Sequence, residues 1–318
     1  MRAWGAPSRS STIRTRMFEH LTTEARNPAS EHLDGLSAIE IVRLINSEDE
    51  KVAAAVAEVS EAIAQAIDVI AERLGRGGRL IYIGAGTSGR LGVLDAVECP
   101  PTFNTHPSQV VGVIAGGYQA LTSAVEGAED RPDLAVEDLK GVRLTDGDVL
   151  VGIATSGRTP YVIGSFDYAR SIGAYTIGVS CNRDPQLATR CDLSIAPVVG
   201  PEVVSGSTRM KAGTATKMVL NMLSTGAMIR LGKTYGNLMV DLRASNTKLA
   251  DRARRIVRAV TNLTDNESER LLSDCGGEVK TAIVSHYTGY SSADARRLLD
   301  ATHGHLRNAL QQHRTNGR

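Results

Sequence analysis

Five short segments rich in β-branched residues alternate with segments of helical pattern, and this alternation constrains the fold more than any other feature. The predicted strands are Arg79 to Ile83, Gln109 to Ile114, Asp148 to Ala154, Ala174 to Ser180 and Leu193 to Pro197. Such alternation is typical of a parallel sheet that is covered by helices on both faces. The sequence therefore predicts an α/β fold of the flavodoxin-like sandwich type.

Apolar residues at helical spacing predict the helices around this sheet. They recur every three or four positions from Lys51 to Leu74, which favours one amphipathic helix. Pro160 to Ala174 predicts a crossover helix with proline in its first turn, and Met210 to Leu231 predicts a long helix. Beyond Ser245 the predicted helices are short and charged: Lys248 to Thr261, Asn266 to Cys275, Glu278 to Tyr287 and Ser292 to Leu310. No internal repeat is apparent.

The length of 318 residues allows one large domain and a smaller one. We predict a disordered tail at 1–16, a helical segment at 17–50, a large α/β domain at 51–244 and a small helical domain at 245–318. The tail is basic but lacks the apolar core of a secretory signal, so export is not expected. Met17 could be the translation start, or the tail could be a short targeting arm.

Composition excludes several classes of protein. A formal net charge of +1 gives no broad field for nucleic acid or an anionic membrane, and no apolar stretch approaches the roughly 18 residues of a membrane span. The cysteines lack CxxC spacing and the histidines form no HExxH pattern, so neither a disulfide framework, nor a zinc site, nor any other metal is predicted. We therefore expect a reducing, cytoplasmic location and an anion-binding site that is local.

Two loops rich in glycine and hydroxyl groups each follow a predicted strand and precede a helix. The first is Ile83 to Arg90 and includes Thr87 and Ser88, and the second is Ala154 to Pro160. Backbone amides at the start of a helix can surround an anion. Loops at the carboxyl ends of parallel strands converge on one crevice, so both can face the same ligand. A phosphorylated small molecule is the predicted occupant.

The first loop alone could equally be a nucleotide-binding turn or a tight structural connection. It reads GxGxxG through Gly84, Gly86 and Gly89, but no acidic residue lies about 20 residues later at the end of a second strand. Asp95 and Glu98 come too soon for that role. A nucleotide cofactor is therefore not predicted.

Two glutamates stand in distinctive surroundings. Glu98 precedes Cys99-Pro100-Pro101, where the prolines are expected to end a helix, and Glu129 closes the run Ala124 to Glu129. Considered singly, each reads as a solvated surface charge, because helical charges normally face water. Their interpretation depends on the motifs that contain them.

Six segments together carry a resemblance to a known family. They are Thr23 to Asn27, Gly84 to Thr102, Ala124 to Asp130, Ser156 to Pro160, Ser205 to Thr214 and Gly236 to Asp241. Over about Thr23 to Ala282 the chain resembles the N-acetylmuramic acid 6-phosphate etherases, which are enzymes of the sugar-isomerase (SIS) fold. The alignment from Ser285 onward is not secured.

The resemblance implies a carbon–oxygen lyase of cell-wall recycling. Its substrate would be N-acetylmuramic acid 6-phosphate, its cosubstrate water, and its products N-acetylglucosamine 6-phosphate and D-lactate, with no cofactor and with a cytoplasmic homodimer as the active form. It implies Glu98 as proton donor and Glu129 as the second catalytic residue, here assigned as the base. The expected substrate-binding residues are Thr87, Ser88, Ser156, Arg158, Thr159, Ser207, Arg209 and Lys211. Arg209 and Lys211 could instead be surface charges.

Two other functions share much of this pattern. An aldose–ketose sugar-phosphate isomerase would use the same loops and a glutamate base, but would not need Glu98 as an acid. A non-catalytic phosphosugar sensor similar to the glucokinase regulatory protein could dispense with either glutamate. Both Glu98 and Glu129 stand in their motifs here, which favours the enzyme.

Overall fold

The structure, a computed structural model, describes residues 21–183, 185–242 and 247–316. The predicted tail at 1–16 and the alternative start at Met17 lie outside these ranges. The strands of the main sheet are β1 (Leu80–Gly84), β2 (Val110–Ile114), β3 (Val149–Ile153), β4 (Tyr175–Val179) and β5 (Leu193–Ile195). All five predicted strands are confirmed to within about two residues at each end.

The main sheet has the strand order β2-β1-β3-β4-β5, and every neighbouring pair is parallel. This order is that of flavodoxin-like doubly wound folds. Alternate residues of β1 enter two separate cores: Leu80 and Tyr82 pack on one face of the sheet, and Ile81 and Ile83 on the other. Burial on both faces explains the nearly continuous apolar strands. The predicted α/β sandwich is confirmed.

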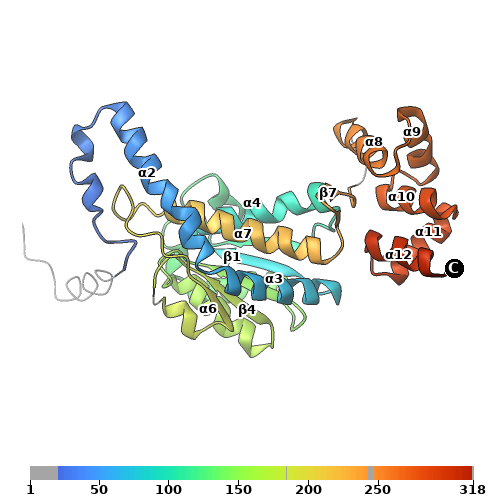
Figure 1. Ribbon diagram of the computed structural model, residues 1–318. Coiled ribbons are helices and arrows are strands. Elements are labelled where there is room, and N and C mark those ends of the chain that lie inside the picture. Colours follow the sequence, from blue (N-terminus) through green and yellow to red (C-terminus); the bar gives the residue numbers. More distant parts are fainter. Residues whose placement is uncertain (1–20, 184, 243–246, 317–318) are drawn as a thin grey trace, which may run out of the picture.

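Helices cover both faces of this sheet (Figure 1). One layer contains α2 (Ala38–Ala57), α3 (Ser60–Gly75), α4 (Gly86–Phe103) and α7 (Lys211–Arg230), and the other contains α5 (Pro132–Gly141) and α6 (Pro160–Ser171). Short 3-10 helices lie at Pro28–Ser30, Leu33–Gly35, Gly117–Leu121, Ala128–Asp130 and Gln186–Thr189. The carboxyl ends of the strands remain open between these layers.

The prediction of a single helix from Lys51 to Leu74 is wrong, because the helix is interrupted between α2 and α3. α2 ends at Ala57, the next residue Glu58 still has helical backbone angles, and Val59 leaves them at φ −110° and ψ 20°. Neither glycine nor proline marks this break. The two helices run in different directions (Figure 1), and both pack on the same core, α2 through Val52 and α3 through Ile63. The change of direction lets both apolar faces reach that core.

The helix containing Glu98 is longer than predicted. We expected the prolines to force an extended path, yet α4 continues through Pro100 and Pro101 to Phe103. Proline loses its own N–H bond, but its carbonyl oxygen still accepts, as that of Pro100 does from the amide of Asn104 at 3.0 Å. Asn104 then ends the helix in the left-handed region at φ 52°.

A buried carboxylate anchors α4 to its neighbours. Asp95 accepts hydrogen bonds from the Tyr82 hydroxyl of β1 at 2.9 Å and from Nζ of Lys217 on α7 at 3.2 Å. Burial, together with the Asp95 charge, raises the pKa of Tyr82 well above its ordinary range. The phenol therefore stays protonated and keeps donating, which fixes α4 between the sheet and α7.

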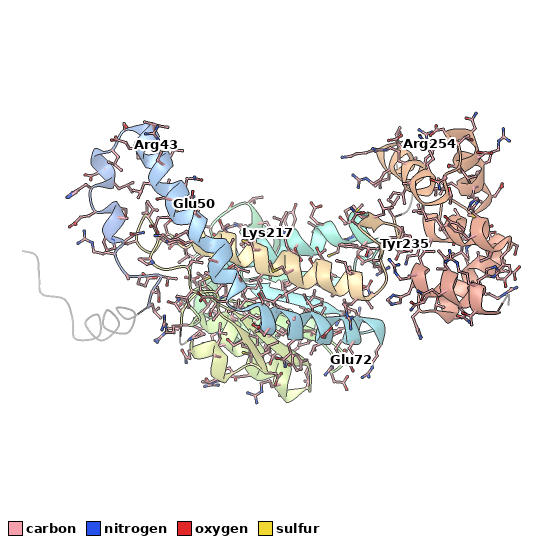
Figure 2. All side chains as sticks on the ribbon, in the orientation of Figure 1. Arg43, Glu50, Glu72, Lys217, Tyr235 and Arg254 are labelled. Carbon is pink, nitrogen blue, oxygen red and sulfur yellow. The ribbon has the colours of Figure 1, made fainter. Side chains whose placement is uncertain are left out.

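A separate helical unit follows α7 (Figure 1). It contains the hairpin strands β6 (Thr234–Tyr235) and β7 (Leu238–Met239), and the helices α8 (Thr247–Thr261), α9 (Asp265–Asp274), α10 (Val279–Thr288), α11 (Ser292–Ala301) and α12 (Leu306–Asn316). Its apolar cluster begins at Val240 and extends to Leu310. In the hairpin, the ring centroid of Tyr235 (Figure 2) lies 5.1 Å from Cζ of Arg307, a cation–π contact.

The helical unit contains a repeat that the sequence analysis missed. The helix predicted from Ser292 to Leu310 is two helices, which are joined by a turn where His303 has φ 52° and Gly304 has φ 75°. The α9–α10 turn has the same two positive φ values at Gly276 and Gly277. The spacing between the starts of α9 and α11 equals the spacing between the starts of α10 and α12. The pair α9–α10 and the pair α11–α12 are therefore two copies of one helix–turn–helix unit.

The described part of the chain offers no helix that is both long and apolar enough to cross a membrane. The four cysteines are free thiols, and burial raises the pKa of Cys99 and of Cys181 to about 12. Such thiols are inert at neutral pH.

Candidate active site

The two predicted phosphate loops meet at the carboxyl edge of the sheet. β1 and β3 are neighbours, so the loops that follow them leave the sheet side by side. Ser88 Oγ of the first loop lies 3.2 Å from Thr155 Oγ1 of the second, within hydrogen-bonding distance. The two loops are therefore in direct contact at this edge of the sheet.

Close backbone packing shapes the first loop. A Cβ atom built on Gly89 would lie 2.6 Å from the carbonyl oxygen of Gly84, so only glycine lets the helix start this close to the strand. Gly86 begins α4 with φ 53°. Thr87 and Ser88 are in the first turn of this long helix, where amide groups lack helical partners and the helix dipole attracts anions. The loop can therefore hold a phosphate group.

The second loop turns sharply into α6. Gly157 has φ 71°, and a Cβ there would lie 2.2 Å from Cβ of Pro185. Ser156 Oγ accepts a hydrogen bond from the amide of Arg158 at 3.2 Å, and Thr159 is the residue before the helix. These side chains are half-buried at the same edge of the sheet. They can add donors to an anion that is held by the first loop.

A third polar loop, just before α7 in the chain, lies near the first loop. The run Ser205 to Arg209 ends where α7 begins, and a Cβ built on Gly213 would lie 4.0 Å from Cγ2 of Thr87. Ser207 is half-buried and Arg209 is exposed. The start of α7 therefore borders the first loop, which brings Ser207 and Arg209 into its neighbourhood.

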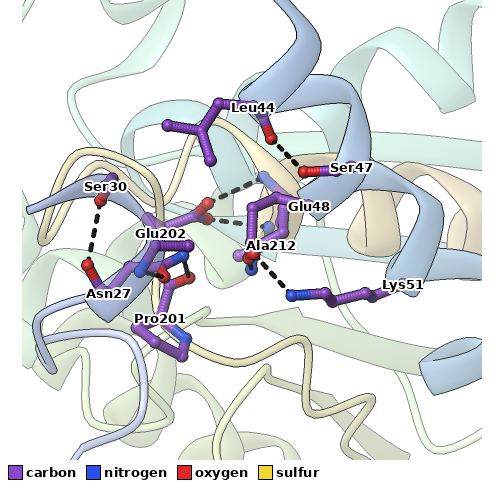
Figure 3. A network of polar contacts seen from close by, with 11 residues as sticks. Asn27, Ser30, Leu44, Ser47, Glu48, Lys51, Pro201, Glu202 and Ala212 are labelled. Atoms are coloured by element: carbon purple, nitrogen blue, oxygen red, sulfur yellow. Dashed lines mark hydrogen bonds and ion pairs between the residues drawn. The ribbon is translucent and has the colours of Figure 1, made fainter. Parts of the chain in front are cut away.

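Lys211 has a different environment from the other predicted binding residues. Its side chain is only 2% exposed, and its ammonium group donates to the carboxylate of Glu48 on α2. Lys51 contacts the same carboxylate at 2.5 Å (Figure 3). Burial by itself raises the pKa of Glu48, but hydrogen bonds from Lys211 and Lys51 outweigh it and lower this pKa to about 2. Lys211 thus tethers α7 to α2 through a buried ion pair.

A second buried carboxylate caps α7 (Figure 3). Both oxygens of Glu202, which is fully buried, accept from backbone amides at the start of the helix: that of Lys211 at 3.0 Å and that of Ala212 at 2.9 Å. Asn27 donates to the carbonyl oxygen of Pro201 at 3.2 Å. These contacts fix the segment that leads into the third loop.

Glu129 lies at a cavity of about 470 Å³ beside the first loop. Gly86 and Arg90 of α4 line the same cavity, together with Glu126. The guanidinium of Arg90 donates to the carbonyl oxygen of Ser123 at 3.1 Å, which ties α4 to the segment that contains Glu129. Glu129 is solvent-exposed and so can meet a ligand that enters from outside. The structure therefore places Glu129 at a cavity that the first loop borders.

Glu98 does not lie with these residues in one chain. It is exposed on α4, about 18 Å along the helix axis from Gly86 at a rise of about 1.5 Å per residue. It is absent from the lining of the Glu129 cavity. Among the other predicted site residues, the structure places Ser88 at the contact between the first two loops and Glu129 at the cavity beside the first loop, whereas Lys211 is buried against Glu48.

Two curated relatives match almost the whole chain. The N-acetylmuramic acid 6-phosphate etherase of Rhodopirellula baltica is 63% identical over 92% of this chain and 97% of its own length, and that of Streptomyces avermitilis is 59% identical over 92% and 94%. The chain belongs to the N-acetylmuramic acid 6-phosphate etherase family. The resemblance seen in the sequence is thereby confirmed.

A family model also matches part of this etherase-family chain. The glucokinase regulatory protein N-terminal SIS domain matches residues 60–170, which include the first loop and both glutamates. Among solved structures, phosphoheptose isomerase GmhA from Neisseria gonorrhoeae is 18% identical, with a TM-score of 0.47 over 60% of this chain and 98% of its own.

Three polar residues of this etherase-family site escaped the sequence analysis: Glu48, Glu202 and Asn182. Asn182 is buried, and its amide donates to the carbonyl oxygen of Thr155 at 3.0 Å and to the hydroxyl of Thr23 at 3.2 Å. It links the second loop to the Thr23–Asn27 segment, whose resemblance to the family was the available signal. Within the described ranges, no cluster of three or more His, Cys, Asp or Glu side chains could hold a metal ion.

Proposed function

We propose that this chain cleaves the lactyl ether of N-acetylmuramic acid 6-phosphate, giving N-acetylglucosamine 6-phosphate and D-lactate. The observation that carries the proposal is the position of Glu129 at a cavity that the first hydroxyl-rich loop borders, where that loop meets the second at 3.2 Å between Ser88 Oγ and Thr155 Oγ1. A phosphate group held by the loops leaves the sugar ring within reach of a carboxylate at the cavity. The names of relatives at 63% and 59% identity support this substrate.

The reaction proceeds by elimination and then hydration. In the open-chain aldehyde, the carbonyl group acidifies the proton on C2, and the lactyl ether oxygen is bonded to C3. Glu129 as base removes the C2 proton, a double bond forms between C2 and C3, and the C3–O bond breaks. Glu98 as acid protonates the departing lactate oxygen. The two carboxyl groups therefore need opposite protonation states at one pH.

Water completes the reaction and restores the enzyme. Glu98, now ionised, takes a proton from water as the oxygen adds to C3, and Glu129 returns its proton to C2. Atoms and protons balance with water as the cosubstrate. We propose no metal or organic cofactor, because the pair of carboxyl groups supplies each proton transfer that the reaction needs.

We assign phosphate binding to Thr87, Ser88, Ser156, Arg158 and Thr159, with Ser207 and Arg209 as neighbours. The contact between the first two loops, and the closeness of the start of α7 to Thr87, support this assignment. Lys211 acts through the position of α7, because its ammonium group is bound to Glu48. Replacing Lys211 should therefore lower the stability of the fold more than it weakens phosphate binding.

We further propose a cytoplasmic homodimer. Four free thiols, three of them buried, support a reducing compartment. Exposed apolar side chains on α4 and α7 support self-association, with Leu94 44% and Met222 40% exposed.

The deciding test is lactate release from N-acetylmuramic acid 6-phosphate in heavy-oxygen water. Wild-type protein should release lactate and place the label at C3 of the sugar product. Glu129→Gln should lose both lactate release and exchange of the C2 proton. Binding without lactate would reject the etherase activity and support a phosphosugar sensor, and a ketose product would support an isomerase.

A further inference from the structure

The cavity that contains Glu129 has one cation in its wall. Its lining comes from the start of α4, from the turn after β2 and from the segment 124–130. Most of these residues are alanine, glycine or valine, and the charged ones are Arg90, Glu126, Glu129 and Asp130. Arg90 is therefore the only positively charged residue that the described part of the chain contributes to this cavity. Neither phosphate binding nor proton transfer, as proposed above, uses it.

The guanidinium group of Arg90 lies at the cavity itself. It donates to the carbonyl oxygen of Ser123 at 3.1 Å, and Ser123 directly precedes the lining segment 124–130. A guanidinium group has five N–H donors, and this contact uses one of them. In the described part of the chain, no carboxylate forms an ion pair with Arg90. The remaining donors are therefore available to an anionic ligand.

The proposed substrate carries a second anion besides its phosphate group. Its lactyl ether ends in a carboxylate, which N-acetylglucosamine 6-phosphate lacks. The carboxylates of Glu126, Glu129 and Asp130 repel such a group at the cavity. Only the guanidinium of Arg90, among the charged groups of the described lining, attracts it. The lactyl carboxylate therefore has one electrostatically favourable position in this cavity.

The position of Arg90 along α4 suits a ligand whose phosphate is held by the first loop. Arg90 is four residues after Gly86, which is about 6 Å along the helix axis at a rise of about 1.5 Å per residue. The phosphate is attached through C6 of the sugar and the lactyl group through C3. A phosphate at the start of α4 and a carboxylate at Arg90 therefore place C3 between them, in the cavity that Glu129 lines.

We infer, on the basis of the proposed function, that Arg90 binds the carboxylate of the lactyl group and so selects N-acetylmuramic acid 6-phosphate over phosphosugars without that group. A guanidinium suits this role because its planar fork can donate two parallel hydrogen bonds to one carboxylate. The contact with Ser123 holds the fork at the cavity. The same ion pair keeps the leaving group in place while the C3–O bond breaks.

Arg90→Gln tests the inference, because glutamine keeps an amide donor but removes the charge. Binding is measured by calorimetry in the Glu129→Gln background, where the substrate should persist. Arg90→Gln should raise Kd for N-acetylmuramic acid 6-phosphate about 10- to 100-fold and change Kd for N-acetylglucosamine 6-phosphate less than about twofold. Retained binding of the second ligand shows that the variant is folded. An equal rise for both ligands would overturn the inference, as would no rise for either.

The lactyl amide of the substrate is the matched ligand, because its carboxyl group carries no charge. Protein that retains Arg90 should bind this amide about as weakly as Arg90→Gln binds the acid. The two changes remove the same ion pair, so combining them should weaken binding little further. Additive losses would show that Arg90 and the lactyl carboxylate do not contact each other.

Two further variants separate this contact from the effect of net charge. Arg76 follows α3 and precedes β1, so it lies at the opposite edge of the sheet from the loops, and its side chain is 74% exposed. Arg76→Gln should leave Kd for both ligands unchanged, and a selective loss there as well would overturn the inference. Arg90→Lys should keep part of the preference, because an ammonium group attracts the carboxylate without matching its two oxygens.

Lactate release by the wild-type protein separates this inference from the proposed function. Selective binding that depends on Arg90, without lactate release, would reject the etherase activity and keep the carboxylate contact. Lactate release with the same KM in wild type and Arg90→Gln would keep the etherase activity and overturn the role of Arg90.

Discussion

The hydroxyl group of Ser88 lies where the first two loops meet, 3.2 Å from Thr155 Oγ1. Ser88→Ala should raise KM for N-acetylmuramic acid 6-phosphate about 10- to 100-fold, because a hydrogen bond to a charged group contributes about 1.5–3 kcal/mol. The turnover number should change less, because the phosphate is distant from the bonds that break. Steady-state kinetics measure both quantities.

Ser60→Ala is a suitable control for Ser88→Ala. The Ser60 hydroxyl donates to the carbonyl oxygen of Ala57 at 2.6 Å, on the exposed side of the α2–α3 junction. It should leave KM unchanged. An unchanged KM in Ser88→Ala itself would remove this hydroxyl from the phosphate site.

Glu48 predicts a pH dependence of stability. Its pKa is about 2 in the folded protein, below its ordinary value of 4.5, so ionised Glu48 stabilises the fold above pH 4.5 and this contribution is lost as the pH falls toward 2. Glu48→Gln should lower the free energy of unfolding by about 3 kcal/mol at pH 7, because it leaves Lys211 buried without its partner. The difference from wild type should shrink below pH 4.5.

Urea unfolding at pH 7 and at pH 3 measures that difference. Glu50→Gln, an exposed carboxyl on the same helix (Figure 2), provides the matched control and should change stability little at either pH. An equal loss for Glu48→Gln at both pH values would show that packing, rather than charge, accounts for the effect.

Residue types were easier to predict than residue surroundings. The hydroxyl groups of Ser88 and Ser156 follow strand ends, so their place at the sheet edge could be inferred from the sequence. The role of Lys211 could not, because its partner Glu48 is 163 positions away and the burial of both depends on how α2 crosses α7. Sequence spacing carries no information about such a contact.

At the scale of elements, the start of α7 depends on Glu202. Glu202→Ala leaves the amides of Lys211 and Ala212 buried without acceptors, which should cost about 2–4 kcal/mol of unfolding free energy. The same change should raise KM, because the Ser205–Arg209 loop leads into this helix. Thermal unfolding and steady-state kinetics test the two effects together.

Thr264→Ala is the matched control, because Thr264 caps α9 in the separate helical unit. It should lower stability by about 1 kcal/mol and leave KM unchanged. If Glu202→Ala destabilised the protein without changing KM, the cap would serve stability alone.

Strands were predicted better than helix ends. Each strand is a short apolar run that is buried on both faces, a pattern few other structures produce. The break between α2 and α3 has no glycine or proline, so only packing against the core reveals it. In the C-terminal unit the signal was present, because Gly277 and Gly304 occupy equivalent turns, but two glycines alone do not define a repeat.

At the scale of the whole molecule, the distance between the glutamates was the feature that the sequence could not reveal. The family resemblance assigned Glu98 and Glu129 to one reaction, but the spacing of their motifs gives no distance between the two side chains. The continuation of α4 through Pro100 and Pro101 holds Glu98 on a helix that leads away from the Glu129 cavity. Family membership names the motifs, but only the three-dimensional arrangement raises the question of which chain supplies each one.

On the scale of the whole molecule, Leu94→Arg tests the proposed homodimer. Leu94 is an apolar side chain of α4 that is 44% exposed, and a charge at this position should weaken self-association through that surface. The variant should sediment as a monomer at micromolar concentration, whereas the wild-type protein should sediment as a dimer. Glu137→Arg, on α5 of the opposite layer, should remain dimeric. A Leu94→Arg protein that stays dimeric would show that the two copies meet at another surface.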